Sequence, residues 1–134
     1  MKILQNYSGS VLLMTIFAIA LFSMLVMGML QINTEEIQLV QNQVNAAEAM
    51  AVAEAGLNDA FAQIRANSGW TSGFANKPFE GGKYTVTVTG ALPNRTITSK
   101  GTSAKGFIAK VEADVTIGSS SPYIIRIDSL RINE

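Results

Sequence analysis

The side chains that usually carry out enzyme chemistry are scarce in this chain. Its 134 residues contain no Cys and no His, so thiolate metal sites, a Cys nucleophile and the commonest general base are all missing. The carboxylates of Glu48 and Glu54 are six residues apart, a spacing that puts them on different faces of a helix. No acid pair, metal-ligand spacing or glycine-rich phosphate loop is visible in the sequence. We therefore expect no enzyme, cofactor or metal site.

A different chemistry, cleavage of the chain itself, is suggested by Gly9. The first nine residues, MKILQNYSG, are short, polar and mildly basic, and Gly9 lies where they give way to an apolar run. Glycine has no Cβ, so it allows a chain to lie extended in a protease cleft. The same glycine also fits an ordinary signal anchor, and both interpretations stay open on these residues alone.

The apolar run at residues 11–30 predicts a membrane-spanning helix. It reads VLLMTIFAIALFSMLVMGML, carries no charge, and is about as long as the ~20 residues that cross a bilayer. A cleaved secretory signal has a shorter apolar core and ends at a small-residue site, which this run lacks. Lys2 precedes the run, while Glu35 and Glu36 follow it, which predicts a cytoplasmic N-terminus and an exported remainder.

The helix is expected to continue beyond the membrane, from Ser10 to about Asn67. There is no Pro before Pro78 and no Gly between residue 30 and Gly56, and good helix formers dominate. Apolar residues recur every three or four positions, at Ile37, Val40, Val44, Ala47 and Ala51 and at Met50, Ala53, Leu57, Phe61 and Ile64. An isolated coiled coil is an alternative, but the heptads are not sustained.

Small residues are concentrated near positions 46–55 of this helix, where they would allow another helix to approach closely. Gly56 lies inside the strongest helical pattern. It is either simply tolerated there, at a cost of about 1 kcal/mol relative to Ala, or it marks close contact with another backbone.

After residue 68 the composition changes to Gly, Ser, Thr and Lys, and the pattern predicts an antiparallel sheet of about four strands. The strands are expected at residues 83–89, 95–100, 107–117 and 123–132, with loops at 90–94, 101–106 and 118–122. Apolar and polar residues alternate, so one face is buried. In the last strand Ile125 and Ile127 should point inward, with a register slip near Ser129.

The only long apolar stripe available to cover this sheet is Met50 to Ile64 of the helix. The sequence therefore predicts an α+β fold, a long N-terminal helix whose first half is transmembrane and whose second half packs on the sheet. Trp70, Phe74 and Phe79 fall in the expected connection and should close the end of the core. A ligand-stacking platform is the alternative for these three aromatic residues.

The charges sum to zero but are unevenly distributed. Residues 31–68 carry five acids and one base, net −4, whereas residues 69–134 carry eight bases and five acids, net +3. Lys100, Lys105 and Lys110 near one predicted hairpin raise the possibility of binding DNA or a surface. Lysines at alternate strand positions ordinarily form a solvated face, so we expect no nucleic-acid partner.

Several motifs together resemble the type IV pilin superfamily, and more narrowly the PilX-type minor pilins. They are residues 9–13 opening the apolar run, residues 45–49, the AEAGL stretch Ala53, Glu54, Ala55, Gly56 and Leu57, Trp70 after the helix, residues 82–86 opening the sheet, and residues 97–101 before the long strand. AEAGL is the most specific of these. The resemblance covers nearly the whole chain, and the last strand has the least support.

The resemblance implies a processing route and partners. Residues 1–9 would be a leader removed at Gly9 by a prepilin peptidase on the cytoplasmic side, which leaves Ser10 as the N-methylated mature N-terminus. Residues 10–30 would span the bacterial inner membrane, residues 31–68 would continue the helix outside it, and residues 69–134 would form the exported β-domain. The partners would be other pilins and minor pilins, the inner-membrane assembly platform and membrane lipid.

Met14 departs from the family pattern. Major pilins carry a glutamate at this fifth mature position, which is thought to pair with the N-terminus of the neighbouring subunit. Its loss is common in PilX-type subunits and in the tip subunit of type II secretion pseudopili. The resemblance therefore implies a minor pilin that acts in filament initiation or at the tip. The alternatives are a minor pseudopilin of a type II secretion system and a tip module for binding or adhesion.

Overall fold

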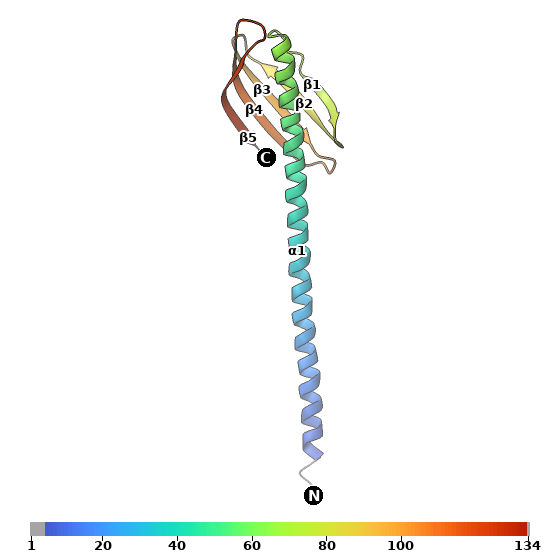
Figure 1. The fold of residues 1–134 in the computed structure, drawn as a ribbon. Helices are drawn as coiled ribbons and strands as arrows, with labels where there is room; N and C mark the ends of the chain where they lie inside the picture. Colours follow the sequence, from blue (N-terminus) through green and yellow to red (C-terminus); the bar gives the residue numbers. More distant parts are fainter. Residues whose placement is uncertain (1–4, 134) are drawn as a thin grey trace. The chain divides into compact units, whose positions relative to one another are not determined.

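The chain folds into one long helix followed by a five-stranded sheet (Figure 1). The computed structural model describes residues 5–133, with side chains from Gly9 onward. The elements are α1 (Gln5–Ala66), β1 (Phe74–Phe79), β2 (Gly82–Thr89), β3 (Asn94–Thr102), β4 (Ile108–Ile117) and β5 (Ile125–Asn133). Neighbouring strands are antiparallel, in the order β1-β2-β3-β4-β5. The predicted α+β fold is confirmed. The chain divides after Gln41 into two units, which are described separately.

The helix α1 begins at Gln5 rather than at Ser10 as expected. No proline interrupts these first turns, and a single glycine costs a helix only about 1 kcal/mol relative to Ala, so nothing local stops the helix from starting earlier. At the other end α1 finishes at Ala66. There the side-chain oxygen of Asn67 accepts a hydrogen bond from the Gly69 amide (3.0 Å), and the chain turns out of the helix.

The first unit, up to Gln41, carries its apolar side chains on the outside. None of its most apolar stretch, near the N-terminus, is buried, and the helix is long and apolar enough to cross a membrane. The Thr15 hydroxyl donates to the Leu12 carbonyl (2.8 Å) and the Ser23 hydroxyl to the Ile19 carbonyl (2.8 Å). Polar groups that are paired within the helix are what a bilayer interior requires.

The four predicted strands are present as β2 to β5, and β1 is an additional strand. Phe74 and Phe79, which we placed in a connection, are the first and last residues of β1. The sequence shows no clear apolar–polar alternation here, because the strand is irregular. Its register with β2 shifts between Phe74 and Lys77, Asn76 has a φ of 48°, and Pro78 has no amide hydrogen to donate to the ladder. Such a strand is tolerated at the edge of a sheet, where β1 lies.

Of three further expectations about the strands, two need correction and one is confirmed. Gly101 belongs to β3 and is buried, whereas we had placed it in a hairpin loop. The register slip near Ser129 is confirmed, because Asp128 is an extra residue between the partners of Val115 and Asp114. Ile127 does lie opposite the buried Val115, but it is 50 % exposed and so is not part of the core as predicted.

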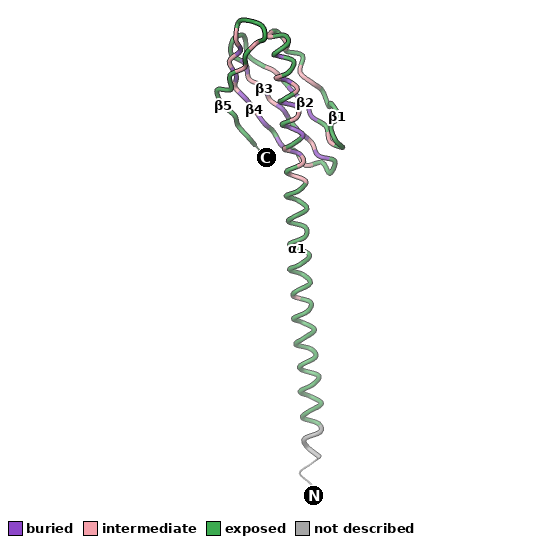
Figure 2. The backbone as a smooth tube through the Cα atoms, viewed as in Figure 1, coloured by how far each residue is buried: buried purple, intermediate pink, exposed green. Residues whose placement is uncertain are grey.

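The core lies between the second half of α1 and the inner face of the sheet (Figure 2). The predicted stripe does cover the sheet: Ala53, Leu57 and Ile64 are buried, and Met50 and Phe61 are partly buried against the core. The helix also buries Ala49, Val52 and Ala60, and the sheet buries Tyr84, Val86, Ile97, Ala109, Val111, Ala113, Val115 and Ile117. The fold therefore depends on one helix face and one sheet face.

The aromatic residues around β1 close one side of this core, as expected. The ring centres of Trp70 and Phe74 are 5.2 Å apart, and those of Phe74 and Tyr84 are 5.9 Å apart in an edge-to-face arrangement. Phe79 lies at the margin, 38 % exposed.

Candidate functional site

The contact between α1 and β3 is so close that it requires glycine on both elements. A Cβ built on Gly101 would lie 2.9 Å from the Cα of Ala53, and closer still to the carbonyl oxygen of Ala49 and the amide nitrogen of Ala53. A Cβ on Gly56 would lie 2.8 Å from Cδ2 of Tyr84 and would overlap Oγ of Ser99. Of the two interpretations left open for Gly56, the structure therefore supports close contact, here with its own sheet.

This contact assigns a role to most of the AEAGL stretch. Ala53 and Leu57 are buried in the core, Gly56 lies against β2 and β3, Ala55 is partly buried and Glu54 is exposed. We expected small residues in this region to allow the approach of another helix. That expectation is wrong for Ala53, which is buried against the sheet, and the small size of Ala53 and Gly56 instead allows α1 to pack closely on the sheet.

A second row of small residues lies on the opposite side of α1. Ala47, Ala51 and Ala62 are exposed and Ala55 is partly buried. At about 100° per residue these four positions share a face, roughly half a turn from the residues that contact the sheet. Small side chains on an exposed helix face allow another helix to approach closely, so this alanine row is a candidate packing surface.

The same spacing of three or four residues continues toward the N-terminus through three larger side chains. Ile37, Val40 and Val44 are each more than half exposed and are called the helix stripe below. They follow the apolar run of residues 11–30 and lie in the part of α1 that precedes the sheet-covered turns. A stripe of this kind is ordinarily buried against a partner.

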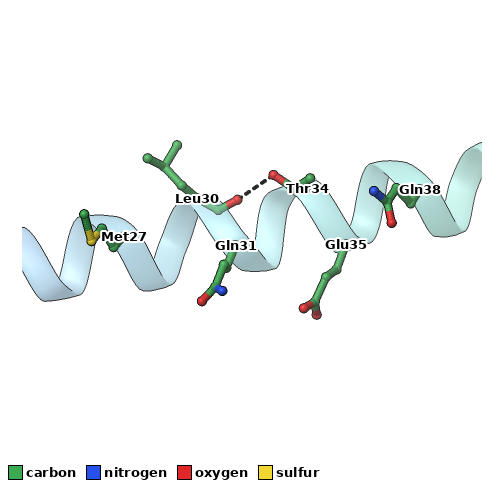
Figure 3. Close-up of a pocket in the computed structure, with 6 residues that line it drawn as sticks. All are labelled: Met27, Leu30, Gln31, Thr34, Glu35 and Gln38. Carbon is green, nitrogen blue, oxygen red and sulfur yellow. Dashed lines mark hydrogen bonds between the residues drawn. The ribbon is translucent and has the colours of Figure 1, made fainter.

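The groove drawn in Figure 3 lies on this bare part of α1. Its six side chains, Met27, Leu30, Gln31, Thr34, Glu35 and Gln38, all project from one helix, with no second element drawn opposite them. The Thr34 hydroxyl bonds back to the Leu30 carbonyl (2.9 Å). An open helix surface of this kind does not enclose a ligand, and within residues 5–133 no group of three or more acids could hold a metal ion.

The edge strand β1 is tied to α1 by a small polar cluster. Nζ of Lys77 lies 2.6 Å from Oδ2 of Asp59, and the Tyr84 hydroxyl donates to the same oxygen. The Lys77 ammonium also lies 4.7 Å from the centre of the Phe74 ring. The hydrogen bonds from Lys77 and Tyr84 hold the pKa of the Asp59 carboxyl below its usual range, and burial raises the pKa of the Tyr84 hydroxyl.

We expect Asp59→Asn to loosen β1 and to lower the free energy of unfolding by less than about 1 kcal/mol, because the ion pair is partly exposed. The pKa of Asp59 is lower in the folded state than its ordinary value of 3.8. The contribution of the Asp59 carboxylate to the free energy of unfolding is therefore fully present above pH 3.8 and is lost as the pH falls through the folded-state pKa. Urea unfolding of both proteins from pH 7 to pH 2.5 should show the difference shrinking in acid. The control Glu54→Gln, at an exposed position of the same helix, should leave stability unchanged; a difference for Asp59→Asn that persists at pH 2.5 would contradict the assignment.

The outer face of the sheet is a connected polar network. Asp114 accepts hydrogen bonds from Thr96 (2.7 Å), Ser129 (2.8 Å) and Arg131 (2.8 Å), and Arg131 also pairs with Glu112 (2.7 Å). The bonds from Thr96 and Ser129 lower the pKa of the Asp114 carboxyl. This network fixes the ladder of β3, β4 and β5 on the side away from α1.

The three lysines considered as a binding patch do lie near one end of the sheet. Lys100 and Lys110 are directly opposite each other on β3 and β4, and Lys105 is in the loop that joins these strands. Lys110 is paired with Glu112 at 3.1 Å. The patch is therefore partly neutralised within the chain.

Two inward-facing polar residues of β3 escaped the sequence interpretation. Arg95 is 6 % exposed and its Nη1 donates to the Trp70 carbonyl (3.3 Å), which holds the segment between α1 and β1 against the sheet. Ser99 is fully buried and lies against Gly56. Arg95 and Ser99 are each two residues away from the buried Ile97, so the strand periodicity places all three on the same face. This periodicity was the available signal for both residues.

The residues of the predicted cleavage site lie near the start of α1. Gly9 and Ser10 are exposed helical residues, and Met14 is 73 % exposed. The first four residues of the expected leader lie outside the described part of the chain. Cleavage at Gly9, methylation of Ser10 and the effect of Met14 remain predictions. No protein-family model matches the chain, and comparison with curated proteins and with solved structures gives no match.

Proposed function

We propose that this chain is a minor pilin of a type IV pilus-like filament, anchored in the inner membrane and acting in filament initiation or at the tip. The observation that carries the proposal is which parts of α1 are covered by the sheet and which are exposed. One face of its second half is covered by the sheet, while the apolar side chains before it, and the alanine row on its other face, are not covered by any of the residues that the structure describes. A helix built in this way suits packing among other helices.

An ordinary membrane anchor explains less. An anchor needs the run at residues 11–30, but it does not need the helix stripe or the alanine row beyond that run. About 20 residues suffice to cross a bilayer, and α1 has 62. The excess apolar surface outside the expected membrane segment is what favours a filament subunit over an anchored soluble domain.

Met14 supports a scarce subunit rather than the bulk protein of the filament. A carboxylate at this position in an apolar run would need a partner, because an unpaired charge in a bilayer is costly. With Met14 the helix offers no such charge to a neighbour. A subunit that does not form this pair suits a site where the filament starts or ends.

The proposed leader is tested by mass. In cells with a prepilin peptidase we expect the chain to lack its first nine residues, and Gly9→Val to abolish this shift completely. A Cβ on Gly9 meets no atom within 4 Å, so the substitution should impair processing without disturbing the fold. Intact-mass measurement of the membrane-extracted chain, with and without the peptidase, reads the result.

Gly28→Val is the matched control, since a Cβ built on this helix glycine also meets no atom within 4 Å and the variant should be processed normally. An unchanged mass of the natural chain in both cells would refute the leader assignment. Quantification of the chain in purified filaments then tests the role: a trace amount supports a minor subunit, a bulk amount contradicts it, and absence contradicts a filament role.

A further inference from the structure

Residues 6–11 are the longest run of weak helix formers in α1. They read NYSGSV, all residue types from the lower half of the helix-propensity ranking, and Gly9 is the weakest among them. Elsewhere in α1 such residues follow one another at most three at a time, at 15–17 and 32–34. The helix nevertheless includes the run, since α1 begins at Gln5. The part of α1 with the least intrinsic tendency to be helical is thus the part that contains the proposed cleavage site.

The peptide bond between Gly9 and Ser10 lies inside the helix. Both residues are helical, so the Gly9 carbonyl points along α1 toward the amide four residues on, at Leu13. Hydrolysis adds water at this carbonyl carbon and breaks the bond to the Ser10 nitrogen, which leaves a carboxylate on Gly9 and a new amino group on Ser10. A protease cleft takes an extended chain, so the first turns of α1 have to open before the bond can be cleaved.

The apolar run limits how far this opening can extend. If α1 opens as far as Ser10, the helix restarts at a residue type whose hydroxyl commonly accepts a hydrogen bond from the amide two or three residues on. The four amides without a helical acceptor then lie in the first turn, within about 6 Å of the start of the helix. Each further residue of unwinding would carry unpaired amides deeper into a bilayer, where they are costly. The bond after Gly9 is therefore the last one that opens without exposing unpaired backbone to the bilayer interior.

We propose that the prepilin peptidase acts on the open state of this segment, and that the weak helix propensity of residues 6–10 controls the rate of leader removal. The inference rests on the proposed function, since it needs the leader and its peptidase. Short helical segments open and close within about a microsecond, whereas enzymes typically turn over about 1–1,000 times per second. The cleavage rate then follows the equilibrium population of the open state, and helix propensity sets that population.

Paired substitutions at Asn6 and Ser8 test this, because alanine and glycine have opposite effects on a helix. Both Asn6→Ala/Ser8→Ala and Asn6→Gly/Ser8→Gly remove the two polar side chains, but alanine favours the helix and glycine disfavours it. We expect the glycine pair to be cleaved faster than the natural chain and the alanine pair more slowly, with rates roughly 15- to 25-fold apart. The full-length chains are reconstituted in lipid bilayers with a purified prepilin peptidase, at concentrations below KM, and intact mass is followed over time.

Gly28→Ala is the control for a general effect of helix stability. A Cβ built on Gly28 meets no atom within 4 Å, and alanine raises helix propensity there too, but the residue lies outside the segment that has to open. We expect this variant to be cleaved at the natural rate. Amide hydrogen exchange of Gly9 and Ser10 in the uncleaved chains, without peptidase, measures the opening itself. It should rank the natural chain and the two pairs in the same order as cleavage does.

The outcomes separate this inference from the proposed function. If the natural chain is cleaved and both pairs are slowed alike, the peptidase recognises the Asn6 and Ser8 side chains, and the inference is wrong while the leader assignment stands. Equal rates for the natural chain and both pairs, slower cleavage of Gly28→Ala, or an exchange order that cleavage does not follow overturn it in the same way. If the peptidase does not cleave the natural chain at all, the leader assignment fails and the inference falls with it.

Discussion

Replacing Gly101 with Ala is expected to destabilise the β-domain by at least about 3 kcal/mol, at the upper end of overpacking effects. The added Cβ would lie 2.9 Å from Cα of Ala53 and closer to two further backbone atoms of α1. Backbone atoms of a regular helix cannot rotate away as a side chain can, so helix and sheet must separate. Urea unfolding of residues 42–134, which form a compact unit with the core, measures the loss.

Gly118→Ala is the matched control for this substitution. A Cβ there would lie 3.4 Å from its nearest neighbour, the Ile124 carbonyl oxygen, which is an ordinary contact. We expect the free energy of unfolding to change by no more than about 0.5 kcal/mol, as is typical of sites without a special packing or backbone constraint. If Gly101→Ala is as stable as the control, the close approach of β3 to α1 is not needed for the fold.

Close approach matters here because the core is small. Alanine and glycine occupy much of the interface between α1 and the sheet, with Ala49, Ala53 and Gly56 facing β3. Such residues bury little apolar area each, so the domain gains stability from intimate packing rather than from large side chains. The described part of α1 before Asn45 contributes nothing to this core, since its large apolar residues, from Val11 to Val44, are exposed.

The elements with a regular pattern could be predicted from the sequence. The three- and four-residue spacing identified which face of α1 meets the sheet. The alternation identified the inward faces of β2 and β4, where Tyr84, Val86 and the five residues from Ala109 to Ile117 are buried, whereas Val88 and Phe107 are only partly buried. These predictions succeeded because each element has one face that must be buried. Local periodicity identifies that face.

The remaining features depend on partners that are distant in sequence. β1 is recognisable only from its pairing with β2, since Asn76 and Pro78 disturb its alternation. The alternation correctly pointed Ile127 inward, but it could not show that α1 is too narrow to cover β5. Gly101 resembled a loop glycine because the atoms that require it, those of Ala49 and Ala53, lie about 50 residues away. The processing site was suggested by sequence alone, and only the proposed mass measurement bears on it.

The AEAGL stretch is the most specific part of the sequence resemblance to the pilins. Its glycine allows helix propensity to be distinguished from packing against the sheet. In an isolated helix Gly56→Ala would stabilise by about 1 kcal/mol. In this fold we expect a net loss of about 2 kcal/mol, because overpacking outweighs helix propensity. The Tyr84 ring, 2.8 Å from the built Cβ, is fixed by its hydroxyl bond to Asp59 and cannot move aside.

Ser99 supplies the second half of the test. Its buried hydroxyl has no hydrogen-bond partner among the described residues and lies against Gly56, so Ser99→Ala alone should be close to neutral. In the double variant Gly56→Ala/Ser99→Ala part of the loss should return, with a coupling of about 1 kcal/mol between the two sites. Urea unfolding of the four proteins of this cycle measures it. Gly56→Ala that stabilises the domain, or zero coupling to Ser99, would mean that the helix glycine is merely tolerated. A coupled loss would instead identify Gly56 as a residue that the close packing of α1 on the sheet requires.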